Sequence, residues 1–520
     1  MTSTTPSRPA GATPDAADRP VRAGARQWAA LGALTLAVTL LAVDGTVLAL
    51  AIPALTADLG ATSTEVLWIG DAYSFALAGL LISMGTLADR IGRKRLLLIG
   101  VAGFGSASLV AAFAPTAGWL IAARILLGVA GATLMPSTLS IVRNVFTDAA
   151  QRTRAIAVWS AGASGGAALG PLVGGTLLEH YWWGSVFVIN LPIMLVVLIS
   201  VALLVPESRN PTAAPFDLVS AVLSVAAIVP LVWAVKHTAK TGVDPAGLLA
   251  AVLSVGAALV FVRRQRTLRT PLVDVTLFAR PAFTGTILVS LITIFFAFSG
   301  LLFFFSQYLQ LVRGHPPLQA GLRELPATLA SIAVVVVAVR LIARLGVGRA
   351  LAAALLVAAA GLGVLAMVEG AAGYTGLAVG LVLVGLGIGM AFTASTDAVL
   401  GAVPRERAGA ASAISEMSYE LGVALGIALL GTLHIALYRA GLPDLSGLPG
   451  PAREAVADSL AAGTRALAGT GEQGTRILDA ARDAFAHGMR ITSVIAAVLL
   501  LVAALIAWKV IPSDRRGARE

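Results

Sequence analysis

Two ionisable residues lie inside long apolar segments of this chain, where water cannot solvate a charge. Asp44 lies in an otherwise apolar run from Trp28 to Leu55, and Arg124 lies in another such run, close to Gly128. A lone carboxylate is costly to bury in hydrocarbon, so we expect Asp44 to face a water-filled cavity, where it could take up and release a proton. The alternative is a hydrogen-bonded packing residue. Arg124 must be paired or solvated, and it either pairs with a carboxylate, senses the proton or only braces helices.

Three further carboxylates could bind a cation. Asp71 follows Trp68 near the expected outer end of an apolar segment, where it could instead simply face headgroup water. Glu416 and Glu420 are one helical turn apart, so they share a helix face. Two carboxylates this close repel each other, which favours sharing one proton and lets a cation replace it. The alternative for both is a side chain that reaches the membrane surface or pairs with an arginine.

These residues must be positioned by membrane helices. Of 520 residues, 58% are hydrophobic and only 12% are charged. Apolar runs of about 20 residues, the length that crosses a bilayer, recur along the chain. In lipid each segment must satisfy its own backbone polar groups, and continuous apolar runs exclude the alternating pattern of a membrane barrel. We therefore predict an all-α polytopic membrane protein.

The composition also excludes several kinds of chemistry. The chain has no Cys, which excludes disulfides and thiolate metal sites, and its five His are scattered. The net charge of +10 comes mainly from Lys and Arg in short loops, so it does not indicate nucleic-acid binding. No nucleotide-binding P-loop is present, which argues against direct use of ATP. We expect neither a cofactor nor a bound metal.

Fourteen apolar segments are predicted as membrane spans. The first six and the last six would form two halves, residues 28–206 and 271–511, with two inserted helices in residues 207–270. Two halves that enclose a site near the bilayer midplane are the plan of secondary transporters. One chain would hold both halves, so we expect a monomer surrounded by lipid. The predicted spans are 29–54, 66–88, 96–114, 118–142, 153–177, 184–205, 217–236, 246–262, 281–311, 322–345, 349–369, 374–401, 406–438 and 487–511.

Basic residues orient these spans. Eighteen Lys and Arg lie in or beside the loops after even-numbered spans, against four (Lys236, Lys240, Arg313 and Arg323) after odd-numbered ones. The positive-inside rule therefore places both termini in the cytoplasm.

Three segments are expected outside the membrane. Residues 1–27 lack the apolar core of a signal peptide and are predicted as a disordered cytoplasmic tail, and residues 512–520 as a second tail. Residues 439–486 are predicted as an outer loop with one or two short amphipathic helices. These helices either gate an outer vestibule or cover it passively.

Two motifs should help the helices to pack and move. A charged turn contains Gly85, Asp89, Arg90, Gly92 and Arg93, and its glycines would permit a sharp reversal while its cations hold it on the inner side. The alternative is an ordinary basic loop. A glycine-rich helix would let neighbours approach closely, with a proline kink beside an opening. The residues that define this helix are Gly166, Gly170, Pro171, Gly174 and Gly175.

Together these motifs resemble the fourteen-helix drug:proton antiporter family of the major facilitator superfamily. The likeness rests on D-x-T at Asp44, G-x-L-A-D-R-x-G-R-K-R from Gly85, R followed by G-x-x-G-A from Arg124, and G-P-L-V-G-G from Gly170. The sequence W-I-G-D-A-Y at 68–73 most resembles exporters of quaternary ammonium compounds and cationic dyes.

The resemblance implies a role for each motif. Asp44 and Arg124 would serve the proton, while Asp71 and Tyr73, with Glu416 and Glu420, would bind the drug. The charged turn would act as the conformational switch, and the glycine-rich helix as the antiporter motif.

The resemblance also implies a function. The chain would be a proton-driven multidrug exporter in the plasma membrane. The alternatives are a dedicated exporter of one natural product or other metabolite, and a membrane sensor or scaffold without transport.

Overall fold

The protein is built from helices. The computed structural model describes residues 23–209, 217–242, 244–269, 271–294, 296, 300–370, 373–403 and 408–513, and no strand occurs among them. Short 3-10 and π-helical turns cover Val275–Ala279 and Tyr308–Val312. The α-helices are α1 (Ala25–Leu59), α2 (Ser63–Ile91), α3 (Arg93–Ala112), α4 (Ala117–Val145), α5 (Ala149–His180), α6 (Ser185–Val188), α7 (Asn190–Leu204), α8 (Leu218–Thr241), α9 (Pro245–Thr267), α10 (Pro281–Thr293), α11 (Gly300–Gln307), α12 (Pro317–Ala333), α13 (Val335–Leu345), α14 (Val347–Val368), α15 (Thr375–Gly401), α16 (Ala408–Ala440), α17 (Gly450–Asp458), α18 (Leu460–Ala466) and α19 (Gly471–Val510).

The prediction of an all-α polytopic membrane protein is confirmed. Twelve helices in the described part are long and apolar enough to cross a membrane, and α12 with α13, bent by 44°, would make a thirteenth crossing. The remaining predicted span, 281–311, includes the short apolar helix α10 and α11, but it also includes residues outside the described ranges. The count of fourteen spans therefore stays a prediction.

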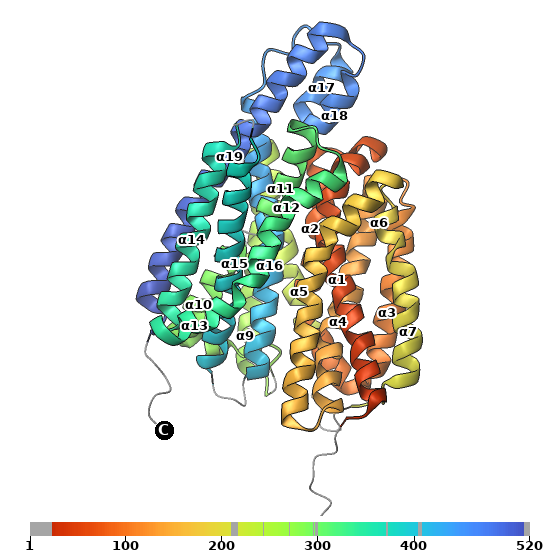
Figure 1. Ribbon diagram of the computed structural model, residues 1–520, viewed down its shortest axis with the longest axis vertical. Helices are drawn as coiled ribbons and strands as arrows, with labels where there is room; N and C mark the ends of the chain where they lie inside the picture. The colour runs from red at the N-terminus through yellow and green to blue at the C-terminus, as the bar shows by residue number, and fades with distance from the viewer. Residues whose placement is uncertain are drawn as a thin grey trace, which may run out of the picture.

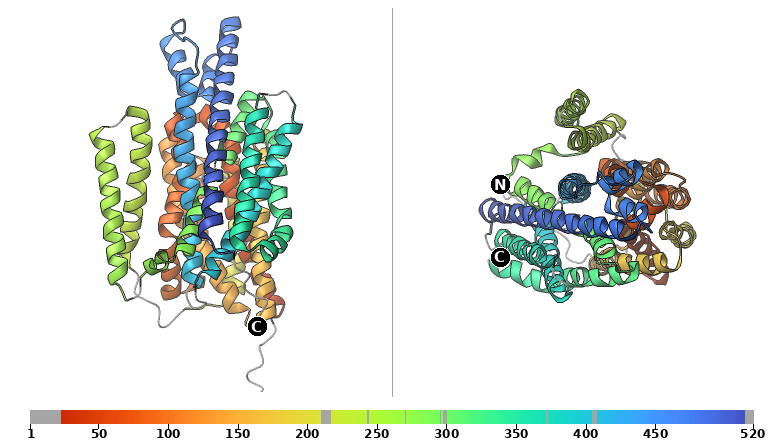
Figure 2. Two further views of the ribbon diagram at one scale, coloured as in Figure 1. Left: turned by 90° about the vertical axis from the view of Figure 1, so that its left-hand side faces the viewer. Right: turned by 90° about the horizontal axis from the view of Figure 1, so that it is seen from above.

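The helices form a bundle with an accessory pair beside it. In Figure 1 the N-terminal helices α1 and α3–α7 gather on the right, and α10, α13–α15 and α19 gather on the left. Figure 2 shows α8 and α9 standing beside this bundle. Of the bundle helices, α8 contacts α2 and α16, one from each half. The inserted pair therefore covers the seam where α2 meets α16.

The two ends of the bundle differ. α1 begins and α19 ends at the bottom in Figure 1, which we call the terminal end, and α17 and α18 lie at the opposite, hairpin end. α17 and α18 are two short helices, as the loop sequence predicts. However, α19 is one helix of 40 residues from Gly471, so the last helix begins well before residue 487.

The N-terminal boundary also differs slightly from the prediction. α1 begins at Ala25, so its first three residues belong to a helix rather than to the predicted tail 1–27. Residues 1–22 and 514–520 of the two predicted tails, and residues 210–216 of the predicted linker region, lie outside the described residues.

Close packing of α5 on α1 explains the glycine-rich sequence. A Cβ added at Gly166 would meet the backbone carbonyl of Thr39, one at Gly170 would meet the Thr46 side chain, and one at Gly174 would meet Val47. Small residues permit such approach between membrane helices.

The same segment of α5 also reaches the C-terminal half. A Cβ at Gly175 would lie 2.6 Å from the Cα of Leu318 in α12, and Gly321 of α12 packs against the carbonyl of Pro171. The motif thus joins α5 to α1 on one side and to α12 on the other.

The charged turn is a reversal through one residue. α2 ends at Ile91 and α3 begins at Arg93, and the intervening Gly92 has a φ of 113°, which glycine adopts at little cost. Asp89 and Arg93 form an ion pair at 2.8 Å. The Glu207 carboxylate accepts hydrogen bonds from the backbone N–H groups of Lys94 and Arg95 in the first turn of α3, and it leaves no room for a Cβ at Gly92. The predicted tight turn is confirmed, and its switching role stays a prediction.

The other two residues of this motif have simpler surroundings. A Cβ at Gly85 would make ordinary contact with Pro136 of α4, at 3.6 Å. Arg90 is exposed at the end of α2.

Candidate functional site

Asp44 and Arg124 form a buried ion pair in the N-terminal half. Arg124 Nη1 lies 2.9 Å from Asp44 Oδ2, and both residues are almost fully buried. Arg124 Nε also donates to the backbone carbonyl of Ile69 at 3.2 Å, which ties α4 to α2. Of the roles that sequence allowed for Arg124, the geometry shows pairing with a carboxylate.

Asn190 completes the cluster around Asp44. Its Nδ2 donates to Asp44 Oδ1 at 3.2 Å and to Ser108 Oγ at 3.1 Å. The cluster thereby gathers α1, α3, α4 and α7 around one carboxylate. Sequence reasoning assigned Asn190 no role, although it lies in an apolar segment that had little reason to hold an amide.

The water-filled cavity expected beside Asp44 stays a prediction. Asp44 is 1% exposed and lines neither of the two pockets described below. Protein groups rather than solvent contact the carboxylate, since Arg124 donates to one of its oxygens and Asn190 donates to the other.

Tyr73 belongs to the same region. The Arg124 guanidinium carbon lies 4.7 Å from the centre of the Tyr73 ring, a cation–π distance. Tyr73, predicted to bind substrate, therefore lies beside the residues predicted to carry the proton. The structure brings these two sets together in one place.

Asp71 also has a cationic partner. Its Oδ2 lies 2.7 Å from the Lys236 Nζ of α8, and neither side chain is more than 3% exposed. The alternative reading, that Asp71 faces headgroup water, is wrong. Lys236 is not a loop residue either. It lies within α8, which continues to Thr241, and its side chain is buried. Sequence reasoning missed this pair because an end-of-span lysine looks like an ordinary topological signal.

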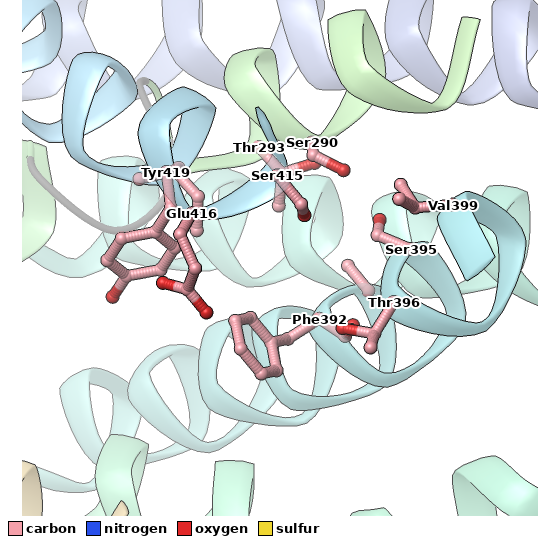
Figure 3. Close-up of a pocket in the computed structure, with 11 residues that line it drawn as sticks. Ser290, Thr293, Phe392, Ser395, Thr396, Val399, Ser415, Glu416 and Tyr419 are labelled. Atoms are coloured by element: carbon pink, nitrogen blue, oxygen red, sulfur yellow. The ribbon is translucent and has the colours of Figure 1, made fainter. Parts of the chain in front are cut away.

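Glu416 lines a pocket in the C-terminal half. The pocket lies among α10, α15 and α16 and contains about 570 Å³ of empty space, part of which is open to its surroundings. Figure 3 shows the Glu416 carboxylate beside the Tyr419 side chain, with the Phe392 ring below them. The Phe392 and Tyr419 rings meet edge to face at 6.0 Å. The other lining residues are five that carry hydroxyl groups and three that are apolar: Ser290, Thr293, Ser395, Thr396 and Ser415, with Ile294, Ala391 and Val399. An acid, two rings and a set of hydroxyls could hold a cation or a polar aromatic molecule.

Glu420 points to the other half instead. It does not line the pocket, and its side chain is hydrogen-bonded to Ser74 of α2. It is also close enough to Arg124 and Tyr73 to interact with them electrostatically. Glu416 and Glu420 thus form a short series of acids between the pocket and the Asp44–Arg124 pair.

Glu324 is a further buried acid that sequence reasoning did not propose as a site. It lies in α12 and is 6% exposed, and the group that hydrogen-bonds to its carboxylate is the Ser306 side chain rather than a cation. Its position inside an apolar span was the available signal.

A second pocket lies under the hairpin end. Its volume is about 500 Å³, and α17 and α18 help to close it. Asp458 of α17 accepts a hydrogen bond from the Ser63 backbone N–H at 2.8 Å, which ties this helix pair to α2. His434 lies in the wall between the rings of Phe304 and Phe485. The α17–α18 segment thus contacts both halves.

Comparisons with known proteins place this chain among transporters. The model of the Major Facilitator Superfamily matches residues 34–427. The multidrug efflux pump LfrA of Mycolicibacterium smegmatis is 44% identical over 95% of this chain and 97% of its own length. The methyl viologen resistance protein SmvA of Salmonella typhimurium is 39% identical over 93% of this chain and 98% of its own. The tetracenomycin C resistance and export protein of Streptomyces glaucescens is 33% identical over 93% and 91%.

Solved structures support the same fold. A bacterial homolog of the human lysosomal transporter Spinster, in an inward-facing and unoccupied conformation, aligns with a TM-score of 0.67 and 19% identity over 95% of this chain and all of that one. A D-xylose–proton symporter aligns with a TM-score of 0.62 and 14% identity over 94% and 98%. The chain therefore belongs to the Major Facilitator Superfamily, as a relative of multidrug efflux pumps, and it is a multi-pass membrane transporter rather than an enzyme.

Proposed function

We propose that this protein exports lipophilic, cationic drugs across the plasma membrane in exchange for protons, with its terminal end in the cytoplasm. The names of its relatives support this proposal, since they include a multidrug efflux pump and a resistance protein for methyl viologen, a dication. The excess of Lys and Arg in the loops of the terminal end supports the orientation.

The observation that carries the proposal is the series of acids from the pocket to the N-terminal half. No cation lies within 4 Å of Glu416 or Glu420 in the described part of the chain, so no ion pair fixes their charge state. An acid in an apolar membrane interior that has no cationic partner is stabilised either by taking up a proton or by binding a cation. The proton and the cationic drug, which an antiporter moves in opposite directions, would therefore compete for the same carboxylates.

The Asp44–Arg124 pair supplies the link to the proton. A proton on Asp44 removes the negative charge that holds Arg124, and the guanidinium is then free to interact more strongly with Glu420. That interaction makes the Glu416–Glu420 region less attractive to a cationic drug. Exchange follows because each ligand stabilises a different state, and differential affinity of this kind is all that coupling requires.

A second candidate is an exporter dedicated to one neutral natural product. The hydroxyl groups in the pocket wall favour it, since Ser, Thr and Tyr side chains can bind a polyhydroxylated ring system. The similarity to the tetracenomycin C export protein also supports it.

The test is substrate-driven proton release in inverted membrane vesicles, with ethidium as the drug. We expect ethidium to trigger proton release with the intact protein, and we expect Asp44→Asn and Glu416→Gln to abolish it. Glu454→Gln, which alters an exposed acid of α17, is the matched control and should behave like the intact protein. Folded protein that responds to no cation would refute cation export and favour the dedicated exporter. A full response with Asp44→Asn would refute the assigned coupling pair.

A further inference from the structure

Asp71 lies in a site that has the chemistry of a cation receptor. Its carboxylate is 0% exposed, and the Trp68 ring lies one helical turn before it on α2. Lys236 Nζ occupies the space between them, 2.7 Å from Asp71 Oδ2 and 3.9 Å from the centre of the Trp68 ring. A carboxylate and an indole face are two groups that attract an organic cation in an apolar setting.

The ammonium fits this site incompletely. An ammonium group carries three donors, and the described contacts of Lys236 Nζ are the Asp71 carboxylate and the Trp68 ring. Neither Nζ nor the Asp71 oxygens have a well-aligned hydrogen bond within the described residues. By contrast, Arg124 and Asp44 share an aligned hydrogen bond and have further partners. The Asp71–Lys236 pair is therefore held by charge and burial rather than by a complete hydrogen-bond network.

The surroundings are apolar and lie where the two halves meet. Phe75 of α2, Val232 of α8, and Ala424 and Ala428 of α16 form one buried cluster, and Trp68 packs against it. Lys236 enters from α8, which is not part of either half. A lysine on the inserted helix thus reaches Asp71 and Trp68 of α2, and Trp68 packs against this apolar cluster.

We propose that Lys236 is a tethered cation that occupies a substrate site formed by Asp71 and Trp68, and that a lipophilic aromatic or quaternary ammonium cation displaces it. The inference rests on the proposed function, because it assumes a cationic substrate. It deepens that function by making Lys236 a specificity-determining residue. Only a cation that binds Asp71 and the indole better than the tethered ammonium does enters the site. When the substrate leaves, the lysine returns and neutralises Asp71, so the carboxylate is never left buried and unpaired.

Ethidium binding to the purified full-length protein in detergent tests this inference. Lys236→Met keeps the length of the side chain and removes its charge, so we expect the Kd for ethidium to fall about tenfold, because Asp71 then needs another cation. The gain should disappear in the double variant Asp71→Asn/Lys236→Met. Lys509→Met, at an exposed lysine near the end of α19, is the matched control and should leave the Kd unchanged.

The outcomes separate a binding role from a structural one. A pair that only docks α8 would lower the melting temperature in both single variants without tightening ethidium binding. An unchanged Kd in folded Lys236→Met, or a gain that persists in the double variant, would overturn the inference. If Lys236→Met does not fold, Asp71→Asn alone decides, since it must weaken ethidium binding if Asp71 forms the site and leave it unchanged otherwise.

The same experiment also tells which proposal fails. If the intact protein neither binds nor transports ethidium, the proposed cation export is wrong. If the intact protein binds and transports it but Lys236→Met and Asp71→Asn behave like the intact protein, only the tethered-cation inference is wrong.

Discussion

The buried acids of the two halves differ in their partners. In the N-terminal half Asp44 pairs with Arg124 at 2.9 Å and Asp71 pairs with Lys236 at 2.7 Å. In the C-terminal half Glu324 and Glu416 have no cation within 4 Å among the described residues. Both sets of acids are held in the same apolar bundle, so the difference lies in what neutralises each charge.

Because of that difference, the two halves should respond differently to protons and to cationic ligands. A buried ion pair is neutral as a unit, and its charge changes only when the pair breaks, which costs several kcal/mol. A buried acid without a partner changes its charge whenever a proton or a cation arrives. The unpaired acids of the C-terminal half are therefore suited to follow the ligands, and the pairs of the N-terminal half are suited to hold the structure until a proton breaks them.

Breaking the N-terminal pair should have the largest effect on stability. Arg124→Met leaves the Asp44 carboxylate buried without its counter-ion, and we expect a loss of about 3–5 kcal/mol. Thermal unfolding of the detergent-purified protein measures this loss.

Glu416→Gln is the matched comparison in the C-terminal half. It removes a half-buried acid that has no cationic partner, so the melting temperature should stay the same or rise. Equal destabilisation by the two variants would contradict the contrast between the halves.

Disturbing the close contact between α1 and α5 should have a smaller effect on stability. Gly166→Ala places a methyl group against the backbone carbonyl of Thr39, and we expect it to push α5 from α1 and to cost about 1–3 kcal/mol. The preceding glycine offers a precise control, because a Cβ at Gly165 meets nothing within 4 Å. Gly165→Ala should leave thermal unfolding unchanged or shift it slightly upward, since alanine favours helix. A comparable loss in both variants would show that α1 and α5 do not depend on close contact there.

An ion pair between the ends of the two inserted helices should have the smallest effect on stability. Asp217, which caps α8, pairs with Arg264 of α9 at 2.9 Å. Burial acts to raise the pKa of Asp217, but hydrogen bonds from Arg264 and Ser220 outweigh it and lower the pKa from 3.8 to about 2. Because the folded state has the lower pKa, the pair stabilises the protein above pH 3.8 and loses this contribution as the pH falls through about 2.

The corresponding variant is Asp217→Asn. We expect it to cost about 1 kcal/mol at pH 7, because solvent screens the partly exposed Arg264. Melting temperatures of the intact protein and the variant should converge as the pH falls below 3.8. A difference that does not depend on pH would show that capping geometry, rather than charge, provides the stabilisation.

Structural features that depend on residues close together in the sequence were predictable from the sequence. Apolar runs of membrane-spanning length gave the helices, because a lipid-facing backbone has no alternative to internal hydrogen bonds. The glycine spacing in 166–175 predicted close helix contact, and the turn at Gly92 followed from the residues beside it. Each of these depends on neighbours within one or two turns of helix. The start of α19 was not predictable in this way, since its polar first part resembles a loop in sequence and its helix packs against α16 and α18, which come earlier in the chain.

The sequence by itself determined which acids lie inside the bundle, and only the tertiary structure decided what accompanies each of them. Asp44 is 80 positions from Arg124 and 146 from Asn190, and no local pattern relates residues so far apart. Lys236 lies near the end of a span, where sequence cannot distinguish a cation at the membrane surface from one that reaches inward to Asp71. Glu416 and Glu420 occupy one face of α16, but α10 and α15 surround the first and α2 meets the second. The physical reason is that hydrophobicity acts along the chain, whereas the partner of a buried charge depends on how helices from distant parts of the chain pack together.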